Sequence, residues 1–170
     1  MFTVAVVPAR SSSRRFPRKN FALFKGEPLV VHVVEMLKRT GRFDRIIVSV
    51  DDPGEAAVIA SLGIDLFVRG EVTSRYEANV AEVCQEVLDS LATQPHAFCC
   101  VYATAFRLRA ETLIRAHEEM LEMNAAGVMG VSVIRDGARA MIQQESGEVK
   151  LLLPESMALA SQHLPRVVAS

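Results

Sequence analysis

Short apolar runs alternate along the chain with amphipathic segments. The first run, residues 2–7, is β-branched and apolar without polar alternation, which is typical of a strand buried on both faces of a parallel sheet. Similar runs predict further strands in the ranges 45–50, 64–68, 98–102 and 127–133. We therefore expect a sheet built from five strands.

Between these runs, apolar residues recur at helical spacing. In residues 28–40 they lie three and four positions apart, with Pro28 in the first turn and Gly41 beyond the end. Asp52 and Pro53 start a second helix. Aspartate is a favourable helix cap, and proline is tolerated in the first turn because the amide donor that it lacks has no partner there. The predicted helices cover the ranges 28–40, 55–62, 77–91 and 110–124. Strands that alternate with helices predict an α/β fold, whose mostly parallel sheet is covered on both faces.

The pattern changes after residue 133. Two segments, 140–144 and 148–153, flank Ser146-Gly147, and this arrangement predicts a β-hairpin with a glycine turn. The length of 170 residues suits one domain. Because the chain shows no internal repeat, linker or low-complexity segment, we expect a single domain over residues 1–170.

Charge and composition narrow the classes of function. Nineteen basic and twenty acidic residues give a net charge of -1, so no overall attraction to nucleic acid or to an anionic membrane is expected. The longest apolar stretches are far shorter than the ~20 residues that cross a bilayer. The N-terminus lacks the layout of a secretory signal, so we expect a cytoplasmic protein. Cys84, Cys99 and Cys100 have no metal-ligand spacing and are predicted to be reduced core residues.

Cations gather in residues 8–20, directly after the first strand. Five arginines and lysines fall within ten residues, together with three serines. Ligands of open parallel sheets bind beyond the carboxyl ends of the strands, and guanidinium groups match the geometry of phosphate. This basic loop therefore predicts a nucleoside triphosphate site, with a solvated surface loop as the alternative. It is not a Walker P-loop, because it lacks the Gly-Lys-Ser/Thr ending.

Several segments together resemble one known family. Residues 7–20, V-P-A-R-S-S-S-R-R-F-P-R-K-N, resemble the opening motif P-A-R-G-G-S-K-R-x-P-x-K-N of the acylneuraminate cytidylyltransferases, the CMP-sialic acid and CMP-pseudaminic acid synthetases. Residues 43–52 are similar to the family's F-D-R-V-I-V-S-T-D-D, and residues 102–105 to its Y/Q-P-T-A/S. Residues 154–155 and 161–165 resemble its P-E-N and R-S-Q-D-L-P segments. The matches follow the family's order over nearly the whole chain.

The resemblance implies a fold, a reaction and an assembly. The fold would be a Rossmann-like three-layer αβα nucleotidyltransferase fold. In the implied reaction, the anomeric hydroxyl of a nonulosonic acid attacks the α-phosphate of CTP, and pyrophosphate leaves with the assistance of Mg²⁺. Alignment and charge neutralisation dominate catalysis of this kind. Residues 139–165 would form a hairpin dimerisation element, so the resemblance also implies a homodimer.

The resemblance assigns roles to individual residues. Arg10 and Arg14 match the positions expected to be catalytic. The implied nucleotide site comprises Ala9, Arg10, Ser11, Ser12, Ser13, Arg14, Arg15, Asn20 and Arg69. The implied binders of the sugar acid are Tyr102, Thr104 and Gln162. Asp51 and Asp52 follow a strand, where they either approach Mg²⁺ or cap the next helix.

The sequence departs from the family pattern at several of these positions. Ser11 and Ser12 replace two glycines, which restricts the approach of the backbone to phosphate, and Ala160 replaces an arginine. The family's aspartate pair for Mg²⁺ lies in a region beyond the position of residue 170, so the resemblance locates no metal ligand here. Three hypotheses stay open. They are a CMP-nonulosonate synthetase, a catalytically impaired nucleotide-binding relative or partner subunit without those metal ligands, and a nucleotidyltransferase for another sugar acid.

Overall fold

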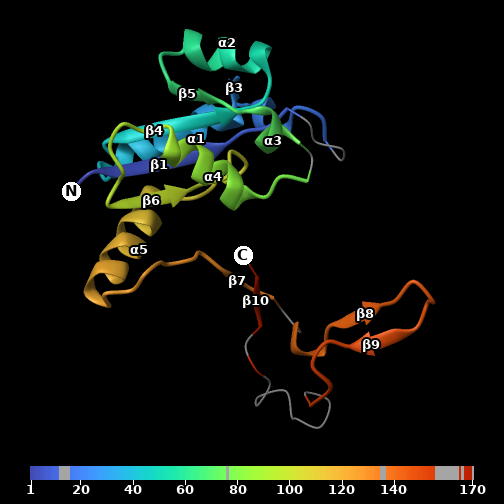
Figure 1. The fold of residues 1–170 in the computed structure, drawn as a ribbon. Coiled ribbons are helices and arrows are strands. Elements are labelled where there is room, and N and C mark those ends of the chain that lie inside the picture. Colours follow the sequence, from blue (N-terminus) through green and yellow to red (C-terminus); the bar gives the residue numbers. More distant parts are fainter. Residues whose placement is uncertain (12–15, 76, 135–136, 156–164, 166, 170) are drawn as a thin grey trace. The chain divides into compact units, whose positions relative to one another are not determined.

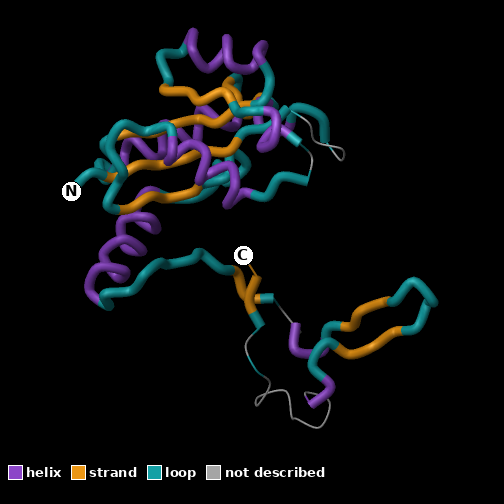
Figure 2. Tube along the Cα trace, in the orientation of Figure 1, coloured by secondary structure: helices purple, strands orange, loops and turns teal. Residues whose placement is uncertain are grey.

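The computed structural model describes residues 1–11, 16–75, 77–134, 137–155, 165 and 167–169. The chain divides into two compact units, Met1–Arg115 and Ala116–Ser170. Figure 2 shows the helices and strands along both. Within the described ranges, no helix is both long and apolar enough to span a membrane.

A four-stranded parallel sheet forms the centre of the first unit (Figure 1). Its spatial order is β5 (Asp65–Val68), β4 (Arg45–Val50), β1 (Thr3–Pro8) and β6 (Ala97–Cys100). Val6 of β1 pairs with Ile47 on one side and with Cys100 on the other. The chain thus runs outward from β1 to β5 and then returns to the opposite side of β1. The order reverses between β1 and β6, where open parallel sheets bind their ligands.

Four helices begin and end near the predicted positions: α1 (Leu29–Thr40), α2 (Pro53–Ser61), α4 (Val80–Asp89) and α5 (Ala110–Glu122), the last of which only starts in this unit. The short α3 (Glu71–Ser74) was not predicted. Gly41 ends α1 in the left-handed conformation, with φ of 60°. The helix α4 begins later than predicted, because Asn79 and Glu82 form a capping box at its start.

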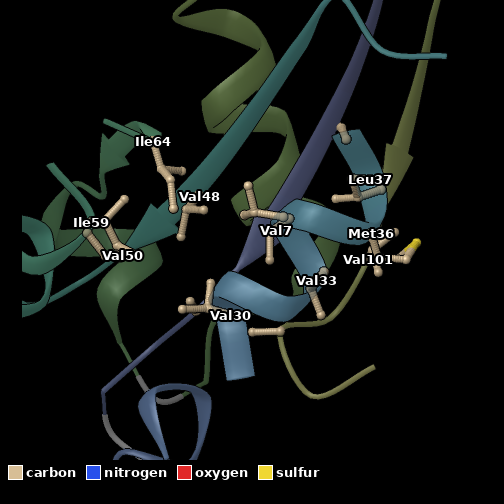
Figure 3. Close-up of a cluster of buried hydrophobic side chains, with 14 residues drawn as sticks. Val7, Val30, Val33, Met36, Leu37, Val48, Val50, Ile59, Ile64 and Val101 are labelled. Carbon is tan, nitrogen blue, oxygen red and sulfur yellow. The ribbon is translucent and has the colours of Figure 1, made fainter. Parts of the chain in front are cut away.

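The sheet has a hydrophobic cluster on each face. On one face Val7 and Val48 pack with Val30 and Val33 of α1 and with Ile59 of α2, all of them fully buried (Figure 3). On the other face the cluster consists of Val4, Val6, Ile47, Cys84 and Val87, the last two from α4. Burial on both faces explains why β1 carries no polar alternation. The predicted three-layer αβα arrangement is confirmed in this unit.

A short hairpin before α1 was not predicted. Its strands are β2 (Leu23–Phe24) and β3 (Glu27–Pro28), and it follows the 3₁₀ helix η1 (Lys19–Phe21). Lys25 and Gly26 both have positive φ, of 52° and 87°, as a two-residue hairpin turn requires. The two-residue strands are too short to show a period in the sequence.

The predicted fifth strand of the parallel sheet is wrong. In that range only β7 (Ser132–Val133) forms, and it pairs antiparallel with β10 (Val168–Ala169) in the second unit. An apolar run predicts a strand but does not determine its partner. The predicted later hairpin is confirmed as β8 (Met141–Gln143) and β9 (Val149–Leu151), with Gly147 at φ of 83° in its turn.

Candidate functional site

A cleft of about 350 Å³ opens at the carboxyl ends of β1 and β6. Its lining comes from segments far apart in the sequence that the reversal of strand order brings together. The polar side chains in its wall are Arg10, Lys19, Asn20, Arg69, Tyr102 and Thr104. The apolar part of the wall is formed by Ala78 and by Val80 and Val83 of α4. Three cations therefore line a cleft whose wall is partly apolar.

The start of the basic loop is held by backbone hydrogen bonds to the neighbouring strand. The amide of Ala9, which is fully buried, donates to the Ser49 carbonyl at 2.8 Å. The amide of Ser11 donates to Asp51 Oδ1 at 2.7 Å. Both amides are therefore engaged within the protein, and neither residue lines the cleft. These two bonds fix the backbone on either side of Arg10, which does line the cleft.

The returning end of the basic loop is tied to its start. The Arg18 amide donates to the Ser11 carbonyl at 3.3 Å, and Arg18 has the left-handed φ of 52°. Asn20 is buried, and its Nδ2 donates to the Arg10 carbonyl at 2.9 Å. These two bonds close the base of the loop. They hold together the two segments that carry Arg10 and Lys19, both of which line the cleft.

Removing the Asn20 amide is expected to destabilise the fold. In Asn20→Ala the Arg10 carbonyl loses its buried donor, so the free energy of unfolding is expected to fall by about 1 to 3 kcal/mol. Asn20→Asp keeps the size of the side chain but loses the donor, and is expected to be destabilised similarly. Urea unfolding followed by circular dichroism measures both. Wild-type stability in both variants would contradict a structural role for this bond.

Arg69 follows β5 and reaches across to β4. Its Nε donates to Ser49 Oγ at 2.9 Å, its Nη2 to the Ser49 carbonyl at 3.1 Å, and its amide to the Val50 carbonyl at 2.9 Å. Burial lowers the pKa of Arg69; the Asp51 carboxylate raises this pKa and the charge of Arg10 lowers it. Arginine stays protonated despite such shifts. The positive charges of Arg69 and Arg10 therefore repel each other, and a bound anion would offset this repulsion.

Glu55 is a buried carboxylate behind the basic loop. It lies one turn before Ile59 on the inward face of α2 and is only 1% exposed. Its Oε1 lies 3.4 Å from Nε of Arg18, and its Oε2 has no hydrogen-bond partner among the described residues. Burial raises the pKa of Glu55, and Arg18 opposes this rise. The carboxylate therefore anchors Arg18 at a cost in desolvation.

The raised pKa of Glu55 predicts a pH dependence of stability. A carboxyl whose pKa is raised by folding contributes stability below its unfolded value of 4.5, and this contribution is lost as the pH rises through the folded value. Relative to Glu55→Gln, the wild type is therefore expected to lose stability as the pH rises above the unfolded value of 4.5, until Glu55 is ionised in the folded protein. Thermal unfolding across this range tests the sign. Glu71→Gln, at an exposed ion pair with Arg75, is the matched control, and an equal slope there would contradict the assignment.

The described carboxylates do not fit a magnesium site. Asp52 Oδ1 accepts a hydrogen bond from the Glu55 amide at 3.0 Å and caps α2. Asp51 Oδ1 is occupied by the Ser11 amide. Across the part of the chain that the structure describes, no three histidine, cysteine, aspartate or glutamate side chains converge as metal ligands. Of the two predicted roles of Asp52, helix capping is the one that the geometry shows.

The remaining predicted site residues divide into two groups. Tyr102 and Thr104 follow β6 and line the cleft, and 56% of Tyr102 is exposed. The others lie outside the described residues: Ser12, Ser13, Arg14, Arg15 and Gln162. Lys19 and the start of α4 also line the cleft, although neither was predicted as a site residue from the sequence. The position of α4 after β5, at the ligand-binding edge of the sheet, was the available signal.

Comparison with known proteins identifies the family. The family model described as cytidylyltransferase matches residues 4–152. A pseudaminic acid cytidylyltransferase of Campylobacter jejuni is 33% identical over 126 residues, which cover 72% of this chain and 54% of the relative. A 3-deoxy-manno-octulosonate cytidylyltransferase of Tolumonas auensis is 38% identical over 86 residues, or 51% of this chain and 34% of the relative. The chain thus spans about half the length, or less, of these curated relatives.

A solved structure supports the same fold. A CMP-2-keto-3-deoxy-manno-octonic acid synthetase in complex with CTP superposes with a TM-score of 0.74 at 17% identity, over 99% of this chain and 70% of that one. At this identity the similarity establishes the fold alone, and it confirms the predicted Rossmann-like nucleotidyltransferase architecture. The family model and the pseudaminate relatives confirm the resemblance found in the sequence. The chain belongs to the cytidylyltransferase family.

Proposed function

We propose that this chain binds CTP in the cleft between β1 and β6 and transfers its CMP group to a nonulosonic acid of the sialic or pseudaminic type. One observation carries the proposal. Arg10, Lys19 and Arg69 line one cleft together with Tyr102 and Thr104, which follow the strand across the reversal of order. Cations that suit a triphosphate and polar groups that suit an acceptor therefore border the same cleft.

The proposed reaction is an in-line displacement at phosphorus. The anomeric oxygen of the sugar acid forms a bond to the α-phosphorus, and the bond from that phosphorus to the bridging oxygen of the β-phosphate breaks. The electron pair leaves with pyrophosphate, and the proton of the anomeric hydroxyl passes to solvent. Arg10 and Arg69 would stabilise the charge that develops on the phosphate oxygens, and Lys19 adds a third cation. Arg14 and Arg15 keep their predicted phosphate roles. The Mg²⁺ implied by the family stays a prediction, because the described carboxylates do not form its site.

The choice of sugar acid rests on the extent of similarity. The pseudaminic acid cytidylyltransferase matches 126 residues, whereas the 3-deoxy-manno-octulosonate cytidylyltransferase matches 86. The longer match favours a nonulosonic acid, with 3-deoxy-manno-octulosonate as the runner-up substrate. Tyr102, Thr104 and Gln162 are the proposed contacts of the acid.

A second candidate is a nucleotide-binding relative or partner subunit with impaired catalysis. One feature of the site favours it. The amide of Ser11, at a position where the family has glycine, is already engaged by Asp51. Such a protein would bind CTP without turnover.

Nucleotide-induced stabilisation and pyrophosphate release together separate these candidates. CTP is expected to raise the unfolding temperature more than UTP, ATP or GTP. Pyrophosphate release is expected with pseudaminic or sialic acid; release with 3-deoxy-manno-octulosonate alone would support the runner-up. Stabilisation by CTP without turnover of any acid would support the impaired relative. If no nucleotide changes the unfolding temperature, both functions are wrong.

We also propose a homodimer assembled through residues 139–165. The β8–β9 hairpin exposes apolar side chains on both of its faces, among them Met141 (64% exposed), Ile142 (51%) and Val149 (52%). Burial of this surface against a second copy would stabilise a dimer. Light scattering at micromolar concentration is expected to give twice the monomer mass. Ile142→Lys is expected to shift the mass toward the monomer, and a monomeric wild type would contradict the proposal.

A further inference from the structure

Two cysteines line a second cavity next to the cleft. Cys84 comes from the middle of α4 and Cys100 from the end of β6, and both border a cavity of about 290 Å³. Leu88 and Phe98 make its wall apolar. Val80 borders both this cavity and the cleft. The two thiols therefore share one space beside the proposed nucleotide site.

The register of the sheet determines which cysteines face each other. Successive side chains of a strand point to opposite faces, so Cys99 and Cys100 lie on different sides of β6. Cys99 packs against the hydrophobic cluster on the α1 side. Cys84 belongs to the cluster on the α4 side, and Cys100 borders the cavity with it. The facing pair is thus Cys84 and Cys100, and Cys99 is excluded from it.

The two thiols differ in their acidity. A hydrogen bond from the Cys100 thiol lowers the pKa of Cys84, against the effect of burial, and the nearby charge of Arg69 lowers it further. The same hydrogen bond raises the pKa of Cys100, and burial adds to this rise. Burial raises the pKa of Cys99 to about 11. Cys84 is thus the first of the three to become a thiolate, with Cys100 as its proton-bearing neighbour.

We propose that Cys84 and Cys100 form a reversible disulfide when the protein meets hydrogen peroxide. The Cys84 thiolate attacks one peroxide oxygen, the O–O bond breaks, and the departing hydroxide takes up a proton to become water. The resulting sulfenic acid at Cys84 is attacked by the Cys100 sulfur, which gives up its proton. The S–O bond breaks and a second water leaves. Two thiols lose two electrons, and one peroxide is reduced to two waters.

The disulfide would join α4 to β6 at the edge of the cleft. Each thiol is held by a regular element, and Val80 lies one helical turn before Cys84 on α4. Reduction by a thiol would release the connection. The inference is independent of the proposed function, because it concerns the chemistry of the thiols alone.

Mass spectrometry with three serine variants tests the pairing. The full chain is treated with hydrogen peroxide, free thiols are blocked with N-ethylmaleimide, and the protein is cleaved after glutamate, which separates Cys84 from Cys99 and Cys100. Wild type and Cys99→Ser are expected to lose two hydrogen atoms and to give the Cys84–Cys100 link. Cys84→Ser and Cys100→Ser are expected to form an intramolecular disulfide at least about tenfold more slowly. Dithiothreitol is expected to restore all thiols.

The controls distinguish a failure to fold, or to bind CTP, from a failure of Cys84 and Cys100 to pair. Circular dichroism establishes that each variant is folded, and alanine replaces serine in any variant that is not. A disulfide that forms as fast in Cys100→Ser as in the wild type would overturn the proposal. A folded Cys99→Ser variant that keeps both of its thiols would also overturn the proposal. A free thiol added to the same solution and oxidised there shows that the peroxide is active. No nucleotide is present, so these outcomes are distinct from failure to bind CTP.

Discussion

Replacing Arg69 with alanine is expected to lower kcat/KM for CTP by about 100-fold, or about 2.7 kcal/mol. Two effects combine in this loss. The variant removes a cation from the wall of the cleft, where its charge interacts with that of Arg10. It also removes two hydrogen bonds to Ser49, which connect the ends of β4 and β5 beneath the site. Charge-assisted hydrogen bonds of this kind contribute about 1.5 to 3 kcal/mol each.

Two further variants separate charge from geometry at this position. Arg69→Lys keeps the charge but loses the planar fork, and is expected to recover at most about tenfold of the lost activity. Arg75→Ala removes an exposed arginine that pairs with Glu71 outside the cleft, and is expected to stay within about threefold of the wild type. Calorimetric titration with CTP and initial rates of pyrophosphate release provide the two measurements. An Arg69→Ala variant with wild-type affinity would remove Arg69 from the proposed site.

Leu37→Ala is expected to lower the free energy of unfolding by about 3 kcal/mol. Leu37 lies near the end of α1, is 1% exposed and belongs to the cluster that packs α1 onto the sheet (Figure 3). Truncation removes buried apolar surface and leaves a space that the rigid sheet cannot fill. Because the same cluster contains Val7 of β1, the loss also loosens the strand that leads into the basic loop.

The matched control for this variant is Leu62→Ala. Leu62 follows α2 and is 49% exposed, so its truncation is expected to cost less than about 1 kcal/mol. Urea unfolding followed by far-ultraviolet circular dichroism measures both variants under the same conditions. Equal midpoints for Leu37→Ala and Leu62→Ala would contradict the assignment of Leu37 to the core.

The strands of the parallel sheet could be predicted because burial on both faces requires a continuous run of apolar residues. β4 forms over Arg45–Val50, the predicted range, and β1 differs from its prediction by one residue at each end. Helix ends followed local chemistry, with the Asp52 cap before α2 and Gly41 after α1. The strand predicted at 127–133 failed because pairing depends on a partner segment. Nothing in the run itself specifies that partner.

The candidate site could be predicted only in part. The basic loop was identified from charge and position, and it does border the cleft through Arg10, Lys19 and Asn20. The sequence did not reveal that the amides of Ala9 and Ser11 are engaged by β4 and the residue after it. Contacts between residues forty positions apart depend on strand order, which a local pattern does not contain.

By itself, the sequence determined the α/β class, most element boundaries, the later hairpin, the basic loop and the cytidylyltransferase family, because each depends on neighbouring residues or on matched motifs. Only the tertiary structure decided the strand order β5-β4-β1-β6, the cleft at its reversal, the burial of Glu55 and the facing of Cys84 and Cys100. The reason is physical. Propensity and capping act within a few residues, whereas burial, pKa shifts and convergent side chains arise when distant segments displace water from one another.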